Sequence, residues 1–435
     1  MAKKRIVILG AGLAGLSAGW HLQKMGIDCR ILEKEAGVGG LCRSKKLDGF
    51  VFDYDGHLLH FRQAYTFNLV KRLLGDNLTE HKRNAWIYSD GAYTRYPFQA
   101  NLYGLPGPVV KECVLGFIEA SRNNHSKKKN NLNFLHWIKQ TFGNGIARHF
   151  MIPYNRKFWT LPPEKLSCSW LDGFIPIPSL REVIEGTIEE NQRQFGYNAH
   201  FWYPKNGGIE ELSLALADEI KNIHLNCPVS EIDLKKKEIK TSTGDKEKFD
   251  HLISTLPLPE MAHLTRGLPK KISHLFTKLK WNSIFNLNLG IERKESLGRH
   301  WVYFPHQEVC FFRVGFFDNF SSRLAPSDKS SLYTEVSYSK DKPINKKGIV
   351  SRINNDLIKT GILSPGDKIY VQDINDIKYG YPIYDRNYCT AREKILDFLS
   401  GNNITACGRF GSWRYMSMEG ALLDGKEAAS GFSAE

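Results

Sequence analysis

The sequence has few of the features that mark disulfide-rich, zinc-binding or membrane-spanning proteins. Its eight cysteines stand singly among 435 residues, without a CxxC pair, and no HExxH motif is present. This spacing fits reduced thiols better than a disulfide framework or a zinc site, so we expect a cytoplasmic protein without a metal. The mostly apolar run at residues 6–20 is too short for a membrane span, which needs about 17–25 residues.

The composition is that of a globular protein with an excess of positive charge. With 42% hydrophobic and 24% charged residues, the chain is neither disordered, collagen-like nor a coiled coil. Lys+Arg 60 against Asp+Glu 46 gives a net charge of +14, which favours nucleic acid, an acidic membrane surface or a phosphorylated small molecule as partner. The lysine run at 127–129 has no interleaved aromatic residues, so we expect a solvated loop and no nucleic-acid binding. A peripheral membrane contact and the oligomeric state stay open.

The amino-terminal residues have the order of a dinucleotide-binding βαβ unit. A β-branched run predicts a buried strand, and it leads through a GxGxxG turn, Gly10, Gly12 and Gly15, into a helix. In such a unit the three glycines allow the tight turn, the approach of a pyrophosphate and close helix packing, respectively. The second strand ends at Glu33, whose carboxylate can accept hydrogen bonds from ribose hydroxyls.

A second glycine cluster favours FAD over NAD. Gly37, Gly39, Gly40 and Arg43 follow Glu33 closely. These glycines could hold a pyrophosphate from its other side, with the arginine as its charge partner. The alternative interpretation is an ordinary glycine loop.

The rest of the chain predicts an α/β fold in which a second domain interrupts the nucleotide-binding fold twice. Residues 63–200 are expected to be mostly helical, and residues 284–338 rich in strands. Further predictions are a turn at 203–208 that opens a helix, a strand at about 223–232, a strand at 249–256, and a last parallel strand at 404–407 that closes the first sheet. The predicted domains are a Rossmann-like FAD-binding domain, 1–62, 203–262 and 400–435, and an inserted α+β substrate domain with a helical part, 63–202, and an antiparallel sheet part, 263–399.

Several longer segments are similar to one known family. They are FDYDGH at 52–57, YPFQ at 96–99, PYNRKFW at 153–159 and GRFGSWRY at 408–415. Together with the FAD-binding start and FDHLISTLPLP at 249–259, they make the chain resemble the flavin-dependent amine oxidase and protoporphyrinogen oxidase superfamily, of the GR2 flavoprotein type. Within it, the chain is most similar to the UDP-galactopyranose mutases, and the resemblance covers nearly the whole sequence.

The resemblance implies an activity and a set of site residues. Mutases of this branch use reduced flavin as a covalent catalyst to contract a sugar ring, without net redox change. The resemblance places His57 beside the isoalloxazine, Tyr96, Gln99, Asn155 and Trp159 around uridine, Arg313 on the diphosphate, and Tyr381 and Tyr415 along the phosphate–sugar path. With the glycine turns, it implies cofactor contacts from Gly10, Gly12, Ala14, Gly15, Glu33, Lys34, Gly39, Gly40, Leu41, Arg43, Val229, Gly408, Arg409 and Met418.

Two positions depart from the mutase pattern. The family's first diphosphate arginine lies fifteen residues after the tryptophan that matches Trp159, where this chain has Phe174. The residue seven after Arg313, a tyrosine in fungal mutases, is Phe320. The loss of a cation and a hydroxyl makes the pocket less suited to a diphosphate, unless Arg181 substitutes from the next turn.

The sequence therefore leaves three functions open. The leading one is an FAD-dependent enzyme acting on a nucleotide- or lipid-linked sugar, by ring isomerisation or oxidoreduction, in polysaccharide or natural-product biosynthesis. Its motivation is the retained YPFQ segment with Trp159 and Arg313, because an arginine in an apolar strand needs an anionic partner. The alternative is an oxygen-dependent amine or protoporphyrinogen-type oxidase, which Phe174 and Phe320 favour. The third, a noncatalytic binder of anionic polymers or membranes, rests on charge alone.

Overall fold

The nucleotide-binding part is built on a parallel sheet of five strands. The computed structural model describes residues 4–123, 133–171, 173–191, 193, 195–196, 199–294 and 297–432, so the predicted loop at 127–129 lies outside the described residues. The first sheet has the order β20 (Ile404–Ala406), β13 (His251–Ser254), β1 (Ile6–Leu9), β2 (Cys29–Leu32) and β9 (Ile223–His224). All four residues of β1 are buried, as expected for a parallel strand covered on both faces. β20 pairs in parallel with β13, which confirms that the far carboxyl-terminal strand joins the first sheet.

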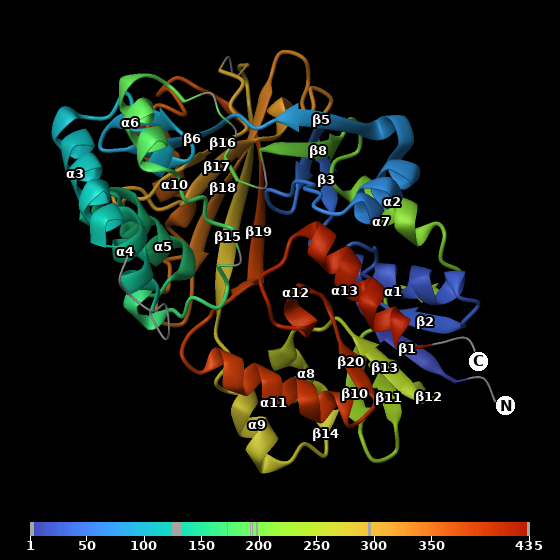
Figure 1. Ribbon diagram of the computed structural model, residues 1–435. Helices are drawn as coiled ribbons and strands as arrows, with labels where there is room; N and C mark the ends of the chain where they lie inside the picture. The colour runs from blue at the N-terminus through green and yellow to red at the C-terminus, as the bar shows by residue number, and fades with distance from the viewer. Residues whose placement is uncertain are drawn as a thin grey trace.

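Helices at the two ends of the chain pack together beside this sheet. α1 (Leu13–Lys24) and α13 (Met418–Ser430) lie side by side, near both chain ends (Figure 1). A Cβ on Gly425 would lie 2.2 Å from the carbonyl oxygen of Ala14, so only glycine permits this approach of the two helices. The other helices outside the helical layer described below are α2 (Ala64–Leu74), α7 (Glu210–Ala217), α8 (Leu258–Leu264), α9 (Lys270–Phe276), α10 (Ile349–Lys359), α11 (Tyr388–Ser400) and α12 (Gly408–Gly411).

A larger mixed sheet forms the other half of the molecule. Its seven strands have the order β19 (Ile369–Pro382), β15 (Trp281–Ile291), β18 (Ser330–Tyr338), β17 (Arg313–Phe316), β16 (Trp301–Tyr303), β6 (Ala85–Ser89) and β7 (Ala92–Arg95). Neighbours pair antiparallel except β16 and β6. The helices α3 (Gly107–Asn123), α4 (Phe134–Ile146), α5 (Ile152–Trp159) and α6 (Leu180–Ile188) form a layer at one side of this sheet (Figure 1).

Three smaller sheets complete the architecture. One has four strands, β12 (Lys246–Lys248), β11 (Glu238–Thr241), β10 (Val229–Asp233) and β14 (Thr265–Arg266). The two others are antiparallel pairs, β3 (Ser44–Leu47) with β4 (Phe50–Asp53), and β5 (Leu78–Lys82) with β8 (His200–Pro204).

The structure corrects several predicted elements. The segment 63–200 is not mostly helical throughout, because β5, β6 and β7 occupy parts of 78–95. The signal for the last two was present: Asp90-Gly91, at φ +53° and +80°, is a two-residue hairpin turn between alternating strands. The predicted strand at 223–232 is two strands in different sheets, since Asn226 has φ +52° and Pro228 follows it. Tyr203 and Pro204 end strand β8 rather than forming a turn.

Candidate active site

The GxGxxG turn has the shape that a pyrophosphate needs. Gly10 has φ +95°, and a Cβ there would lie 2.3 Å from Thr255 Oγ1. A Cβ on Gly15 would lie 2.0 Å from the Gly10 carbonyl oxygen, so packing within the protein requires glycine at both positions. At Gly12 the nearest atom to a Cβ is Gly40 Cα at 3.9 Å, an ordinary contact. Packing therefore does not explain Gly12, whereas a ligand that approaches this backbone does.

The second glycine turn lies directly against the first. The Gly39 N–H donates to the Ala11 carbonyl at 2.8 Å. The buried Glu33 carboxylate accepts from the Ala11 N–H at 2.7 Å and from the Glu35 N–H at 3.0 Å. Because a carboxylate has about four lone-pair sites, it keeps acceptor capacity for ribose hydroxyls. The two turns and the acid thus fit an adenine dinucleotide.

The other predicted cofactor positions on the amino-terminal side differ in their exposure. Lys34 is exposed and pairs with Glu35 at 3.5 Å. Arg43 donates from Nε to the Gly40 carbonyl at 3.0 Å, which anchors it to the second turn. Leu41 lines a small cavity together with His57. Val229 begins β10, two residues after Cys227, whose N–H donates to the Glu33 carbonyl at 2.8 Å.

The carboxyl-terminal positions meet the first turn from the other side. Gly408 has φ +80°, and its N–H donates to Asp424 Oδ2 at 2.6 Å. A Cβ on Gly408 would lie 2.8 Å from Ala14 Cβ, so this turn packs against the start of α1. Arg409 donates from Nη2 to the Met416 carbonyl at 2.7 Å, and Met418 is the first residue of α13.

One cavity of about 230 Å³ brings the predicted substrate residues together. It is lined by α5 and the two residues before it, by the segments 56–60 and 170–176, by the seven-stranded sheet and by the carboxyl-terminal turn. The predicted residues on its wall are Tyr96, Gln99, Asn155, Trp159, Arg313, Tyr381, His57, Arg409, Tyr415 and Met418. Further residues that were not predicted also line it: Tyr154, Phe158, Met151, Trp170, Trp301, Tyr303 and Phe312. Of these, Tyr154 and Phe158 could have been found from the segment PYNRKFW, because they flank Asn155 and Trp159 on the same helix face.

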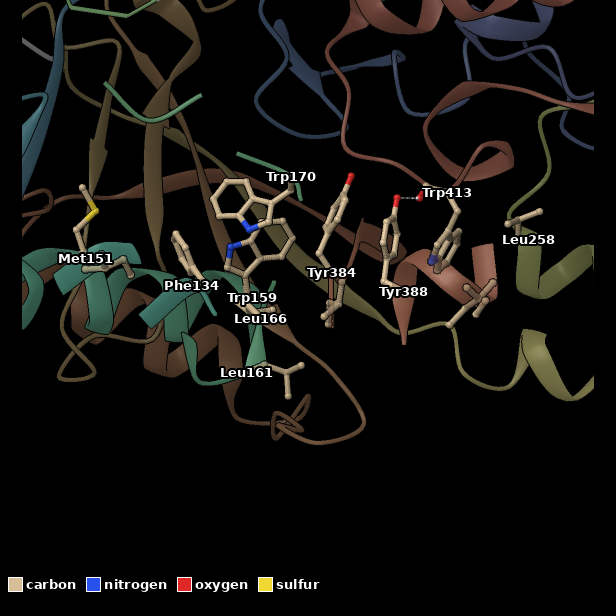
Figure 2. Packing of buried hydrophobic residues seen from close by; sticks show 14 of the residues in the cluster. Phe134, Met151, Trp159, Leu161, Leu166, Trp170, Leu258, Tyr384, Tyr388 and Trp413 are labelled. Carbon is tan, nitrogen blue, oxygen red and sulfur yellow. Dashed lines mark hydrogen bonds between the residues drawn. The ribbon is translucent and has the colours of Figure 1, made fainter. Parts of the chain in front are cut away.

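The cavity wall is largely aromatic. Tyr381 stacks on Tyr415 with ring centroids 5.6 Å apart, and Trp159 contacts Trp170 edge to face at 5.0 Å. Figure 2 shows these two indoles side by side next to Phe134. Such a wall suits a planar or apolar ligand group.

Some polar atoms of this wall are buried without a partner among the described residues. They are Gln99 Oε1 and the indole nitrogens of Trp159, Trp170 and Trp301. Gln99 is fixed in place, since its Nε2 donates to the Pro176 carbonyl at 2.7 Å. Their residues line the cavity, but these atoms themselves have almost no accessible surface, so a ligand reaches them only if the wall shifts.

The predicted anion ligand Arg313 has a partner inside the protein. It lies opposite Glu335 in the β17–β18 register and forms a two-pronged ion pair with it, with Nη2 to Oε1 at 2.7 Å. Although burial opposes the charge, the Glu335 carboxylate holds the pKa of Arg313 well above its usual range. The anionic partner expected for this arginine is therefore present in the chain.

A histidine and two tyrosines on the wall are neutral near pH 7. Burial lowers the pKa of His57 to about 4, against the opposing effect of Asp55, so its imidazole is uncharged. Burial raises the pKa of both Tyr381 and Tyr415, which keeps these phenols protonated and able to donate. Arg409 lies over the rings of these tyrosines at 5.1 and 5.9 Å.

The structure separates the two departures from the mutase pattern. Phe174 lines the cavity and contacts Tyr415 at 4.9 Å, as expected for a position near the substrate. Phe320 does not line it, because this ring is buried in the core against Tyr203 at 5.3 Å. The expectation that Phe320 shapes the pocket is therefore wrong. Arg181 does not line the cavity either: its side chain is 82% exposed and pairs with Glu185, so it does not replace the missing cation.

The chain belongs to the family of flavin containing amine oxidoreductases, whose model matches residues 13–431. It is accordingly an FAD-dependent enzyme of this family, and the glycine turns described above are the residues that would hold the cofactor. None of the described helices is long and apolar enough to cross a membrane.

Relatives with similar sequences carry the names of different enzymes. The chain is 23% identical over 302 residues to "Probable flavin-containing monoamine oxidase A" of Dictyostelium discoideum, covering 64% of this chain and 63% of that protein, just under two thirds of its length. It is 24% identical over 420 residues to a 4,4'-diapophytoene desaturase of Staphylococcus aureus, covering 86% and 80%.

Among solved structures, a reduced UDP-galactopyranose mutase is similar with a TM-score of 0.93 and 28% identity, covering 98% of this chain and 95% of that one. A fatty acid isomerase from P. acnes has a TM-score of 0.69 at 16% identity over the full length of both chains, which shows the shared fold alone.

Proposed function

We propose that this FAD-dependent enzyme acts on an activated, anionic sugar, as a UDP-galactopyranose mutase-like isomerase or a sugar oxidoreductase. The observation that carries the proposal is the cavity wall, where Tyr96, Gln99, Asn155 and Trp159 lie together with two arginines, Arg313 and Arg409. Two guanidinium groups on one wall favour a substrate with a polar, anionic part over an apolar one. The similarity to the reduced mutase structure supports the same assignment.

The charges of the cavity favour a substrate with limited negative charge. Arg313 and Arg409 are the cations on the described wall, and Glu335 offsets the first of them. Where the mutase family has its other arginine, this chain has the uncharged Phe174. We infer that the site binds a phosphate-bearing sugar through one dominant cation, Arg409, with Arg313 in support.

The residues of this chain have distinct proposed tasks. FAD, when bound, supplies the electron-transfer or covalent chemistry. Tyr381 and Tyr415, protonated and stacked, donate hydrogen bonds to the phosphate–sugar part of the substrate. The neutral His57 accepts or donates a hydrogen bond without adding charge. Trp159 and Gln99 orient the base, and the aromatic rings exclude water.

The test is conversion of UDP-galactopyranose by the FAD-loaded protein after anaerobic reduction, followed by chromatography of the products. We expect the reduced protein to form the furanose product, or its flavin absorbance to change when the ligand is added. The oxidised protein should show neither. A Gln99→Leu variant, which replaces the amide on the wall by an apolar side chain, should bind UDP about tenfold more weakly. If the reduced protein neither binds nor converts any of a panel of nucleotide sugars, the proposal fails.

A second function is favoured by one specific observation. The internal pairing of Arg313 with Glu335, together with the uncharged Phe174, makes the cavity less cationic than two unpaired arginines would. This supports an oxygen-dependent oxidase of the amine or protoporphyrinogen class, acting on a largely apolar substrate. Hydrogen peroxide released in proportion to substrate oxidised, across amines and porphyrinogens, would favour it over the sugar enzyme.

A further inference from the structure

Lys157 is a buried lysine whose ammonium group donates to backbone oxygens of three described residues. Its side chain is 1% exposed on α5. Nζ donates to the carbonyls of Phe304 at 2.9 Å and Phe311 at 3.1 Å, and also to that of His306. All three acceptors belong to the connection between β16 and β17. One side chain thus fastens the helix to this connection.

The ammonium lies on the side of the helix that faces away from the cavity. Asn155 and Trp159, four residues apart, share the helix face that lines the cavity. Lys157 is two residues from each, which turns it by about 200° to the opposite side. The cavity side of the same junction is closed by ring contacts, Phe158 with Phe312 at 5.2 Å. Lys157 is therefore not placed to touch a ligand.

The connection that it holds ends in residues of the cavity. Phe304 directly follows Tyr303, and Phe311 precedes Phe312 and Arg313, all on or beside the wall. The Phe304 N–H also donates to the Phe312 carbonyl at 2.9 Å, so the two ends of the connection are joined. A shift of this connection would move Arg313 relative to Trp159.

The opposite side of the connection is held by a polar network. His306 Nε2 bonds Ser89 Oγ at 2.9 Å and lies 3.4 Å from Asp90 Oδ2, in the β6–β7 turn. Burial lowers the pKa of Lys157 to about 7, which reflects the cost of keeping an ammonium there. The three backbone carbonyls match the three N–H donors of the protonated form and offset part of that cost, whereas leucine or methionine would fill the same space without it. The retained polar group therefore needs a reason beyond filling the core.

We propose that Lys157 is a positioning residue, which holds the β16–β17 connection in the register that sets Arg313 and Tyr303 against Asn155 and Trp159. This inference rests on the proposed function only for the identity of the ligand. A binding group shifted by about 1 Å loses its hydrogen bond to the ligand, and the loss of one such bond weakens binding by up to about tenfold.

The experiment compares Lys157→Met, Lys157→Arg and Lys45→Met in FAD-loaded protein. Lys45 is a matched control, because it also bridges two elements, bonding Asp373 at 2.9 Å and Asn375 at 2.8 Å, away from the cavity. The readouts are UDP affinity by calorimetry and amide hydrogen exchange of the peptide covering 304–312. We expect Lys157→Met to bind UDP about tenfold more weakly and to exchange faster in 304–312. Lys45→Met should change neither.

The arginine variant separates donation from packing. Arginine keeps the donors but adds bulk, whereas methionine keeps the volume but loses the donors. If Lys157→Arg binds UDP more tightly than Lys157→Met, the donors matter; the reverse order overturns the proposal. If the arginine variant does not fold, Asp90→Asn is used instead, because it removes the carboxylate beside His306 on the other side of the connection. This variant should weaken UDP binding by a smaller factor than Lys157→Met does.

Failure of this inference is distinguishable from failure of the proposed function. If the wild-type protein binds no UDP, the sugar function fails. The amide hydrogen exchange of residues 304–312 in Lys157→Met then tests the positioning role of Lys157 by itself. Unchanged exchange in Lys157→Met, or unchanged UDP affinity where the wild type binds UDP, overturns the positioning role.

Discussion

Replacement of Glu335 by glutamine tests the central electrostatic feature of the cavity. Glu335 has no exposed surface, and the Arg313 side chain is 16% exposed. The glutamine variant leaves the guanidinium buried without its counter-charge. Removal of one partner of a buried pair costs about 3–5 kcal/mol, because the remaining charge keeps its desolvation penalty. We expect the free energy of unfolding to fall by that amount, measured by urea denaturation of FAD-loaded protein.

The double variant Arg313→Met, Glu335→Met is the control for this prediction. It removes both charges, so most of the lost stability should return, to within about 1–2 kcal/mol of the wild type. A second readout concerns binding: without its counter-charge, Arg313 in Glu335→Gln should bind UDP or pyrophosphate more tightly. The ion-pair interpretation is refuted if Glu335→Gln lowers the free energy of unfolding by less than about 1 kcal/mol and the double variant is no more stable than Glu335→Gln. The two side chains would then not form a buried ion pair in which each charge needs the other.

Three further predictions concern the cofactor, the ligand and pH. Gly12→Asp should abolish FAD absorbance while the fold survives, because the protein atom nearest to a Cβ there is Gly40 Cα at an ordinary 3.9 Å; Gly107→Asp, with no atom within 4 Å of its Cβ, should keep the flavin. Trp159→Phe and Trp413→Phe each remove part of a fully buried indole, so both should lose a similar amount of stability, but only Trp159→Phe, on the cavity wall, should weaken UDP binding. Burial lowers the pKa of His300 to about 3, so the stability that its neutral form contributes is complete above about pH 6.5 and is lost as pH falls toward 3. His300→Asn should flatten the fall in melting temperature between pH 6.5 and 4.5, and an identical fall in both proteins would contradict this.

Local patterns were sufficient for the nucleotide-binding start. The βαβ unit, the roles of Gly10 and Gly15 in tight packing, and the last parallel strand are confirmed, because each depends on short-range spacing. Elements whose partners lie far away in the chain were less predictable. The strands β6 and β7 were missed although Asp90-Gly91 marks their turn, since an aromatic-rich segment has no clear period.

The candidate site shows the same division. Motif similarity placed Tyr96, Gln99, Asn155 and Trp159 in one group, and the structure brings all four to one cavity. Their individual roles stay predictions. The cavity positions of Trp170 and Trp301 had no signal in the sequence, because each depends on how distant segments pack.

The sequence by itself determined the cofactor and the class of enzyme. Glycines at fixed spacing and an acid after the second strand meet a requirement of the backbone, which is local and therefore readable from one chain. Only the tertiary structure decided the electrostatics of the pocket. It pairs Arg313 with Glu335, buries Phe320 in the core and leaves Phe174 on the wall. The physical reason is that the energy of a buried charge depends on which residues surround it, and those neighbours are brought together by strand register and packing rather than by sequence proximity.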